Sequence, residues 1–159
     1  MKLENKYLYL AFISAALATY SVQGADWPVW GGDGSRNMVS FEKAVTLDFD
    51  PGRMSEEEVV DMKTTKNVKW VAKLGSQSYG NVTVADGRVY VGTNNESPRD
   101  PAKKGDRGVV MSFDEKSGKL HWQLVIPKLG AGKVSDWEYI GVCSSPAIEG
   151  NRAYVVTNK

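Results

Sequence analysis

The sequence predicts an all-β protein built from repeated strand hairpins, the units that form the blades of a β-propeller. Short runs rich in β-branched residues alternate with turns that use many of the 16 glycines and 6 prolines. Two segments, residues 78–94 and 143–158, align with each other, and their tyrosines Tyr90 and Tyr154 are 64 residues apart. Internal repeats of strand hairpins are typical of propellers, whose four-stranded blades bury their faces against one another.

Residues 1–24 have the three-part form of a secretory signal peptide. A positively charged start precedes an uncharged apolar run at residues 7–18, which is too short to span a bilayer core as a helix. Small residues allow cleavage after Ala18 or between Gly24 and Ala25, of which we expect the second. We therefore expect a periplasmic or secreted protein with no membrane insertion after cleavage; the alternative is an uncleaved N-terminal anchor.

Residues 25–66 form a lead-in to the repeats. Ser55, followed three residues later by Glu58, has the spacing of a capping box. The pair predicts a short surface helix of roughly two turns that ends near Met62.

Residues 67–159 carry the blade pattern. In residues 67–74 the apolar Val68, Trp70 and Ala72 alternate with polar neighbours. This period of two predicts a half-buried β-strand.

Three predicted hairpins follow, each with a glycine in its turn. Asp86-Gly87 is the strongest hairpin signal, because this dipeptide accepts the positive φ values of a type I′ turn. The polar residues 94–107 are predicted to form a long exposed loop. The hairpins are residues 81–85 with 88–93, residues 108–114 with 119–126, and residues 147–148 with 152–157.

Residues 113–122 (FDEKSGKLHW) resemble the Asp-x-x-Ser/Thr-Gly-x-x-x-Trp signature of the PQQ-like (pyrroloquinoline-quinone-like) propeller repeat. Residues 84–93 are similar to the hairpin that precedes that signature, and residues 26–32 (DWPVWGG) resemble the opening common in exported bacterial members. The resemblance implies a partial β-propeller of about two to two and a half four-stranded blades. It also implies that the chain is an N-terminal fragment, incomplete at its C-terminus.

The residues of this signature have physical roles of their own. Gly118 is free to adopt the positive φ that closes a turn, while Asp114 and Ser117 are suited to bind the turn amides. Trp122 is expected to pack between adjacent blades, with its indole N–H bonded to a carbonyl or a turn side chain across the interface. His121, the next residue along the strand, is expected to face solvent.

Composition excludes several classes of function. Without the predicted leader the chain carries equal numbers of acidic and basic residues and has no basic run, which argues against binding nucleic acid. One cysteine, Cys143, excludes an internal disulfide framework and a cysteine-built metal site. One histidine excludes His-rich metal sites, so the sequence assigns no catalytic residue and no metal ligand.

The acidic and aromatic segment 135–139 and the single cysteine lie outside the repeat signature. Residues 135–139 (SDWEY) are acidic and aromatic, so they either line a ligand or partner surface or form a loop that packs Trp137 inward; the inward loop is the prediction adopted. Cys143 is predicted to be a small buried residue rather than a nucleophile, because a second histidine is absent.

The function predicted is that of an exported propeller-repeat protein that acts as a binding or scaffold module, with its protein or small-molecule ligand unidentified. The resemblance leaves two alternatives. One is the N-terminal part of a PQQ-dependent alcohol or sugar dehydrogenase, which holds PQQ and calcium; the adjacent cysteine pair of those enzymes is missing, since Ser144 follows Cys143. The other is a cell-envelope assembly factor that binds an extended strand of a partner.

Overall fold

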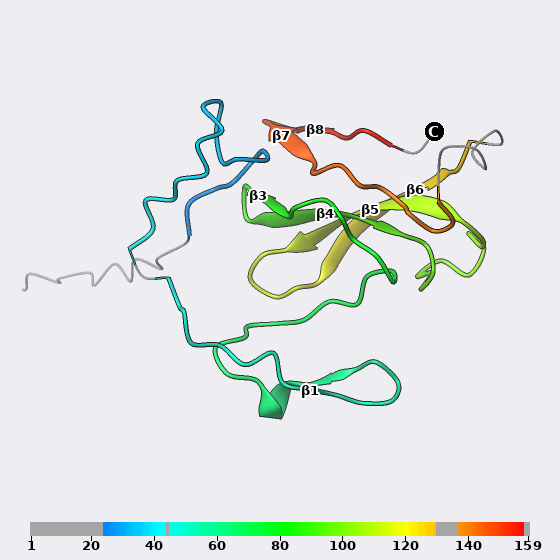
Figure 1. The fold of residues 1–159 in the computed structure, drawn as a ribbon, viewed down its shortest axis with the longest axis horizontal. Coiled ribbons are helices and arrows are strands. Elements are labelled where there is room, and N and C mark those ends of the chain that lie inside the picture. Colours follow the sequence, from blue (N-terminus) through cyan, green and yellow to red (C-terminus); the bar gives the residue numbers. More distant parts are fainter. Residues whose placement is uncertain (1–23, 44, 130–136, 158–159) are drawn as a thin grey trace, which may run out of the picture.

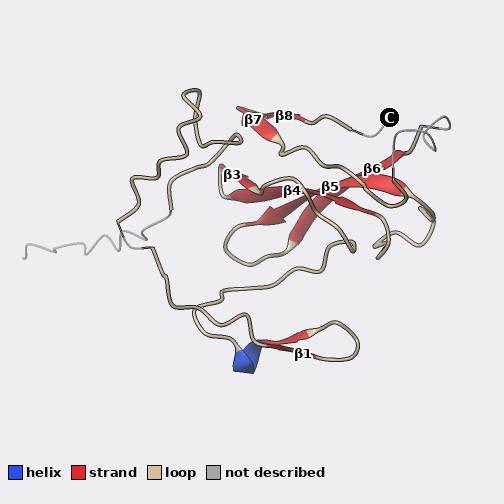
Figure 2. Ribbon diagram, in the orientation of Figure 1, coloured by secondary structure: helices blue, strands red, loops and turns tan. Residues whose placement is uncertain are grey.

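The computed structural model describes residues 24–43, 45–129 and 137–157, and these form the predicted all-β fold of antiparallel sheets (Figures 1 and 2). Nearly all of the predicted signal peptide lies outside the described residues. Within the described residues, no helix has the length and apolar character needed to cross a membrane. The elements are β1 Arg53–Met54, β2 Val60–Asp61, the 3-10 helix η1 Met62–Thr64, β3 Thr83–Ala85, β4 Arg88–Asn94, β5 Arg107–Asp114, β6 Leu120–Pro127, β7 Ala147–Glu149 and β8 Arg152–Tyr154.

The four-stranded sheet β3-β4-β5-β6 forms the centre, and the two-stranded ribbons β1–β2 and β7–β8 lie on either side of it (Figure 1). The three predicted hairpins are confirmed as β3–β4, β5–β6 and β7–β8. Asp86 and Gly87 join β3 to β4 with φ values of 51° and 70°, as a type I′ turn requires. In each of these three hairpins a short turn joins the two paired strands.

The turn between β5 and β6 is built as the signature predicts. The Asp114 carboxylate accepts hydrogen bonds from the backbone N–H and the hydroxyl of Ser117. Gly118 has a φ of 69°, and its N–H donates to the Asp114 carbonyl at 2.8 Å. These bonds fix the turn and with it the pairing of Asp114 with the start of β6.

One face of the sheet carries the main apolar cluster, made by Val91, Val109, Met111 and Phe113. Segment 68–74, which we call the strap, covers this face with Trp70, Ala72 and Leu74. The Trp70 and Phe113 ring centroids are 6.1 Å apart, and Trp70 Nε1 donates to the Glu115 carbonyl at 2.8 Å. The strap is therefore attached both to the core and to the β5–β6 turn.

The predicted strand at residues 67–74 is wrong in one respect and right in another. Its burial alternates as predicted, with Val68, Trp70, Ala72 and Leu74 half-buried and the residues between them exposed. It does not, however, pair with any described strand. Alternating burial shows only which side chains face a core. Trp70, Ala72 and Leu74 reach the core because the segment lies over the face of the sheet, not because it pairs with an edge strand.

The other face of the sheet carries Tyr90 and Trp122, whose ring centroids are 6.1 Å apart. Val142 is fully buried on this face, where a Cβ at Gly92 would lie 2.8 Å from a Val142 methyl group. The β7–β8 ribbon follows on the same side. Trp122 is half-buried while His121 is exposed, as predicted.

The predicted helix from Ser55 to Met62 is wrong, because these residues form the β1–β2 hairpin and the start of η1. The Ser55 hydroxyl accepts from Val59 N–H rather than from Glu58 N–H. Glu58 has a φ of 59°, which no α-helix permits, and its carboxylate pairs with Lys73 instead of folding back on Ser55. Long-range pairing has replaced the local cap.

Three further expectations need correction. The polar loop connects β4 to β5, but Asn94 belongs to β4 and Asn95 is buried. Cys143 is exposed rather than buried, because Val142 takes the inward position and the next residue of an extended chain points outward. Trp137 does not pack inward but is 77% exposed, because its carbonyl, not its indole, faces the protein and accepts from Lys128.

Candidate functional site

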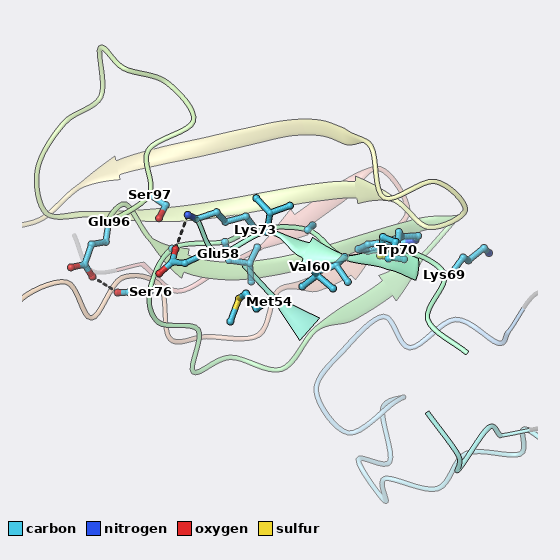
Figure 3. A pocket seen from close by; sticks show the side chains of 15 residues that line it. Met54, Glu58, Val60, Lys69, Trp70, Lys73, Ser76, Glu96 and Ser97 are labelled. Atoms are coloured by element: carbon cyan, nitrogen blue, oxygen red, sulfur yellow. Dashed lines mark hydrogen bonds and ion pairs between the residues drawn. The ribbon is translucent and has the colours of Figure 1, made fainter. Parts of the chain in front are cut away.

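A groove of about 900 Å³ runs along the strap, between it and the β1–β2 hairpin (Figure 3). Apolar side chains of Met54, Val60 and Trp70 line its floor and walls, and the charged groups of Glu58, Lys73 and Glu96 lie at its rim. The groove exists because the lead-in folds back on the strap as a hairpin instead of a helix.

The strap offers unused backbone groups. Among the described residues, the N–H groups of residues 68–74 donate no hydrogen bond, and the one carbonyl that accepts is that of Lys73, from Arg99 Nη2 at 2.6 Å. An extended segment whose backbone groups lack partners is a template for another strand. The side chains of the strap thus alternate in burial like those of a strand in a sheet, but its backbone N–H groups have no hydrogen-bond partner among the described residues.

The strap is held firmly at both ends. Trp70 is fixed near one end by its bond to the β5–β6 turn. Just past the other end, Gly75 N–H donates to Thr93 Oγ1 at 3.1 Å and Ser76 N–H donates to Asn94 Oδ1 at 3.1 Å. A Cβ at Gly75 would lie 2.0 Å from Asn94 Oδ1, so glycine is required for this close approach.

Arg99 holds the strap near its C-terminal end, at Lys73. Its guanidinium carbon lies 5.7 Å from the Phe113 ring centroid, a cation–π distance, while Nη2 binds the Lys73 carbonyl. The predicted loop between β4 and β5 therefore reaches back to brace the strap. A strand held in this way is already ordered before anything binds to it, which lowers the entropy cost of binding.

The charged rim of the groove consists of exposed pairs. Lys73 Nζ lies 2.7 Å from a Glu58 carboxylate oxygen, and the hydrogen bond and charge of Lys73 hold the pKa of Glu58 below its usual range. Ser76 donates its hydroxyl to Glu96. Since exposed pairs exchange easily with water, this rim is adaptable and adds little rigidity.

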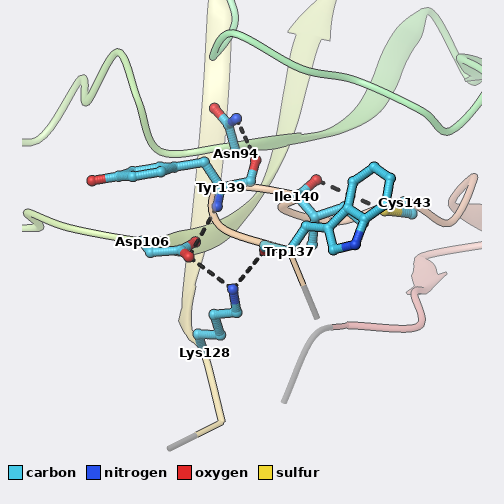
Figure 4. A network of polar contacts seen from close by, with 7 residues as sticks. All are labelled: Asn94, Asp106, Lys128, Trp137, Tyr139, Ile140 and Cys143. Atoms are coloured by element: carbon cyan, nitrogen blue, oxygen red, sulfur yellow. Dashed lines mark hydrogen bonds and ion pairs between the residues drawn. The ribbon is translucent and has the colours of Figure 1, made fainter. Parts of the chain in front are cut away.

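A second network anchors the chain that follows β6 (Figure 4). Lys128 Nζ lies 2.9 Å from Asp106 Oδ2, which also accepts from Tyr139 N–H at 2.9 Å. Partial burial by itself raises the pKa of Asp106, but these two hydrogen bonds outweigh it and hold the pKa below its usual value. Asn94 Nδ2 donates to the Tyr139 carbonyl at 2.6 Å, which connects this network to the end of the strap.

The structure places Trp137, His121 and Cys143 apart from the groove, whereas Trp70 and Glu58, which the sequence also singles out, line it. Trp137 lies on the outside of the Asp106 network, and residues 135 and 136 lie outside the described part of the chain. The His121 ring lies 3.9 Å from Asp114 at the β5–β6 turn. In the described part of the chain, His, Cys, Asp and Glu do not form a group of three or more that could hold a metal ion.

The sequence indicates only some of the residues that build the groove: Trp70 and Ala72 belong to the predicted half-buried strand, and Glu58 to the predicted helix cap. Val60 is predicted to lie in that helix, Met54 in the lead-in before it, and Arg99 in a long exposed loop. A usable signal was present in Thr93-Asn94, because the same Thr-Asn pair closes both aligned segments. In the sequence the Thr-Asn pair marks the end of an aligned segment. In the structure the Thr93 and Asn94 side chains also accept hydrogen bonds from the backbone of residues 75 and 76, just after the strap.

Comparison with known proteins found no matching family model, no matching curated protein and no matching solved structure.

Proposed function

We propose that this protein is a propeller-repeat scaffold that binds an extended segment of a partner protein as an added strand along the strap. The observation that carries this proposal is that residues 68–74 alternate in burial like a sheet strand while their N–H groups have no acceptor among the described residues. Strand addition uses main-chain hydrogen bonds for affinity and apolar pockets for alternate side chains. The groove supplies both.

The propeller part of the proposal is supported by contacts that recur between repeats. Ser78 donates its hydroxyl to the Gly92 carbonyl at 2.7 Å, and Ser144 donates to the Val156 carbonyl at 2.8 Å. Gly92 and Val156 are equivalent in the aligned segments, so the two hairpins receive the preceding chain in the same way. The β7–β8 ribbon is accordingly assigned as the start of a second blade of the PQQ-like type.

Trp70 supports the same arrangement. It precedes the first hairpin as Trp122 precedes the next, and its indole rests on the Asp114–Gly118 turn, where a Cβ at Gly118 would lie 2.5 Å from the ring. Trp70 Nε1 donates to the Glu115 carbonyl, the kind of bond expected of Trp122, and this bond supports the stacking of units through tryptophan. Stacking of one repeat on the next through tryptophan explains why the turn needs glycine.

Of the two alternatives, the groove favours the assembly factor over the dehydrogenase. A strap with unused N–H groups recognises another polypeptide, whereas PQQ and calcium need oxygen ligands and a flat aromatic floor. Export to the periplasm or the medium remains a prediction from the leader and is part of this proposal. The dehydrogenase alternative also remains a prediction, which dye reduction with PQQ, calcium and an alcohol or sugar would test.

The strand-addition proposal is tested by hydrogen exchange. The probe is a blocked peptide of alternating valine and threonine, N-methylated on one edge so that it does not associate with itself. Because a strand added to the strap protects its N–H groups, we expect the alternate amides of residues 68–74 that face the peptide to exchange at least about tenfold more slowly. The control is the same peptide with its second edge methylated as well, which should protect nothing.

A matched pair of variants locates the binding site. Met54 lies in the groove wall and is exposed, whereas Met38 is exposed and lies outside the groove. Met54→Glu places a charge against the apolar side chains of the peptide and should weaken binding at least about fivefold, and Met38→Glu should not. Unchanged exchange of the strap amides at saturating peptide, or equal effects of the two variants, would contradict the proposal.

A further inference from the structure

A second cavity, of about 350 Å³, lies on the opposite face of the sheet from the groove, between that face and the turn of the β7–β8 ribbon. It is independent of the strap and of peptide binding. Its walls carry two aromatic rings, two guanidinium groups, one carboxylate and one amide, from Tyr90, Trp122, Arg88, Arg152, Asp86 and Asn151.

The floor of this cavity is formed by Tyr90 and Trp122, which belong to one row of residues across the sheet. Thr83 pairs with Tyr90, Tyr90 with Ser112, and Ser112 with Trp122, across β3, β4, β5 and β6. The planes of the Tyr90 and Trp122 rings make an angle of 54°. Two tilted rings of this kind form a shallow apolar floor that the face of a small ring can cover.

The same row contains hydroxyl groups without a partner. Ser112 and Thr83 are fully buried, and neither side-chain oxygen has a hydrogen-bond partner among the described residues. Ser112 lies in the row between the two aromatic residues. Neither residue lines the cavity, and since buried polar groups are nearly always hydrogen-bonded, we expect ordered water to complete these two hydroxyls.

Arg88 and Arg152 form no ion pairs with the acidic residues opposite them in the strand register. Arg88 lies opposite Asp114 in the sheet, but that carboxylate is bonded to Ser117 and forms no ion pair with Arg88. Arg152 lies opposite Glu149, which accepts from the Tyr154 hydroxyl. Neither guanidinium forms an ion pair or side-chain hydrogen bond with another described residue, so both have donors to offer a ligand.

We propose that this cavity binds a small hydroxylated ring that carries one anionic group, such as an acidic monosaccharide. The aromatic floor suits the apolar face of a sugar ring, and the polar atoms around it suit its hydroxyl groups. Two guanidiniums against the single carboxylate of Asp86 leave one positive charge in excess, which matches one carboxylate or phosphate on the ligand. The volume is at the lower end of the range of about 300–1,000 Å³ for small-molecule pockets, so a single sugar fits better than a chain.

The experiment is calorimetric titration of the purified protein with four probes: glucuronate, glucose 6-phosphate, glucose and acetate. We expect saturable binding of at least one of the two acidic sugars, and the two arms show whether the carboxylate or the phosphate is preferred. Glucose and acetate should bind at least about tenfold more weakly, because glucose lacks the anionic group and acetate lacks the hydroxylated ring.

Three variants test the assignment to this cavity. Arg88→Gln and Arg152→Gln should each weaken binding of the acidic sugar at least about tenfold, as expected for loss of a charge-assisted hydrogen bond. Arg53→Gln, at an exposed arginine of β1, should leave it unchanged. Absence of saturable binding by both acidic sugars, binding of acetate as strong as that of the acidic sugar, or wild-type affinity in both cavity variants would overturn the proposal.

Discussion

Replacing Gly118 by alanine should destabilise the protein far more than a glycine-to-alanine change normally does. The first cost is conformational, because Gly118 has a φ of 69°, which costs an L-residue about 1–2 kcal/mol. The second is steric, because the new Cβ would lie 2.5 Å from Trp70 Cδ2. Moving the indole to relieve this contact breaks its bond to the Glu115 carbonyl and its packing on Phe113, and overpacking of this kind costs about 1–3 kcal/mol. The expected loss is therefore about 2–5 kcal/mol.

Gly150 provides the matched control. It lies in the β7–β8 turn with a φ of 55°, but a Cβ there would meet nothing within 4 Å. Gly150→Ala should therefore cost only the conformational part, about 1–2 kcal/mol. The difference between the two variants isolates the contact of Trp70 with the turn.

The assay is urea unfolding followed by tryptophan fluorescence and far-UV circular dichroism. A double-mutant cycle adds Gly118→Ala to a Trp70→Leu background, in which the clashing ring is gone and the cost should fall to that of Gly150→Ala. If Gly118→Ala and Gly150→Ala lower the free energy of unfolding equally, or if Trp70→Leu does not relieve the cost, then the indole does not rest on this turn and the stacking of repeats through it is wrong.

Three further predictions concern charge and exposure. The pKa of Asp106 in the folded protein is held below its ordinary value of 3.8. The ionised Asp106 therefore stabilises the fold above that value, and this stabilisation is lost as the pH falls through the folded pKa. Asp106→Asn should flatten the dependence of the unfolding free energy on pH in this acid range. Glu58→Gln removes an exposed ion pair and should shift the unfolding midpoint by less than about 2 °C in thermal melts. Cys143 is exposed, so one equivalent of a thiol reagent should label it in the native protein, which mass spectrometry would detect.

The hairpins could be predicted because their determinants are local. Asp86-Gly87 and the Asp114–Gly118 turn specify their own geometry through positive φ values and side-chain bonds to turn amides. The helix at Ser55–Met62 could not be excluded, because the capping spacing is also local. What overrides it is a competing local hairpin, in which Met54 pairs with Val60, together with the more distant contact of Glu58 with Lys73.

The groove was beyond prediction for a related reason. Alternation in residues 67–74 identifies the side chains that face the core, but it carries no information on whether the backbone of the segment finds a neighbour. Trp70 was matched to Trp122 in the sequence, yet its contact with Gly118 lies 48 residues away along the chain. Arg99 gave no signal at all, since a lone arginine in a polar loop is ordinarily solvated.

The two proposed sites are lined by segments that pack on opposite faces of the four-stranded sheet. The strap comes from the chain before the sheet and covers one face, while β7–β8 comes from the chain after it and lies on the other. A sheet of four short strands has two faces to bury, and repeat architectures bury them on adjacent repeats. The contacts on each side, Trp70 against Gly118 and Val142 against Gly92, therefore help to fix the strap, which forms one wall of the groove, and the chain that leads into β7–β8, which forms one wall of the cavity. It follows that a change at either glycine should impair binding at the site on its own face before it impairs binding at the other.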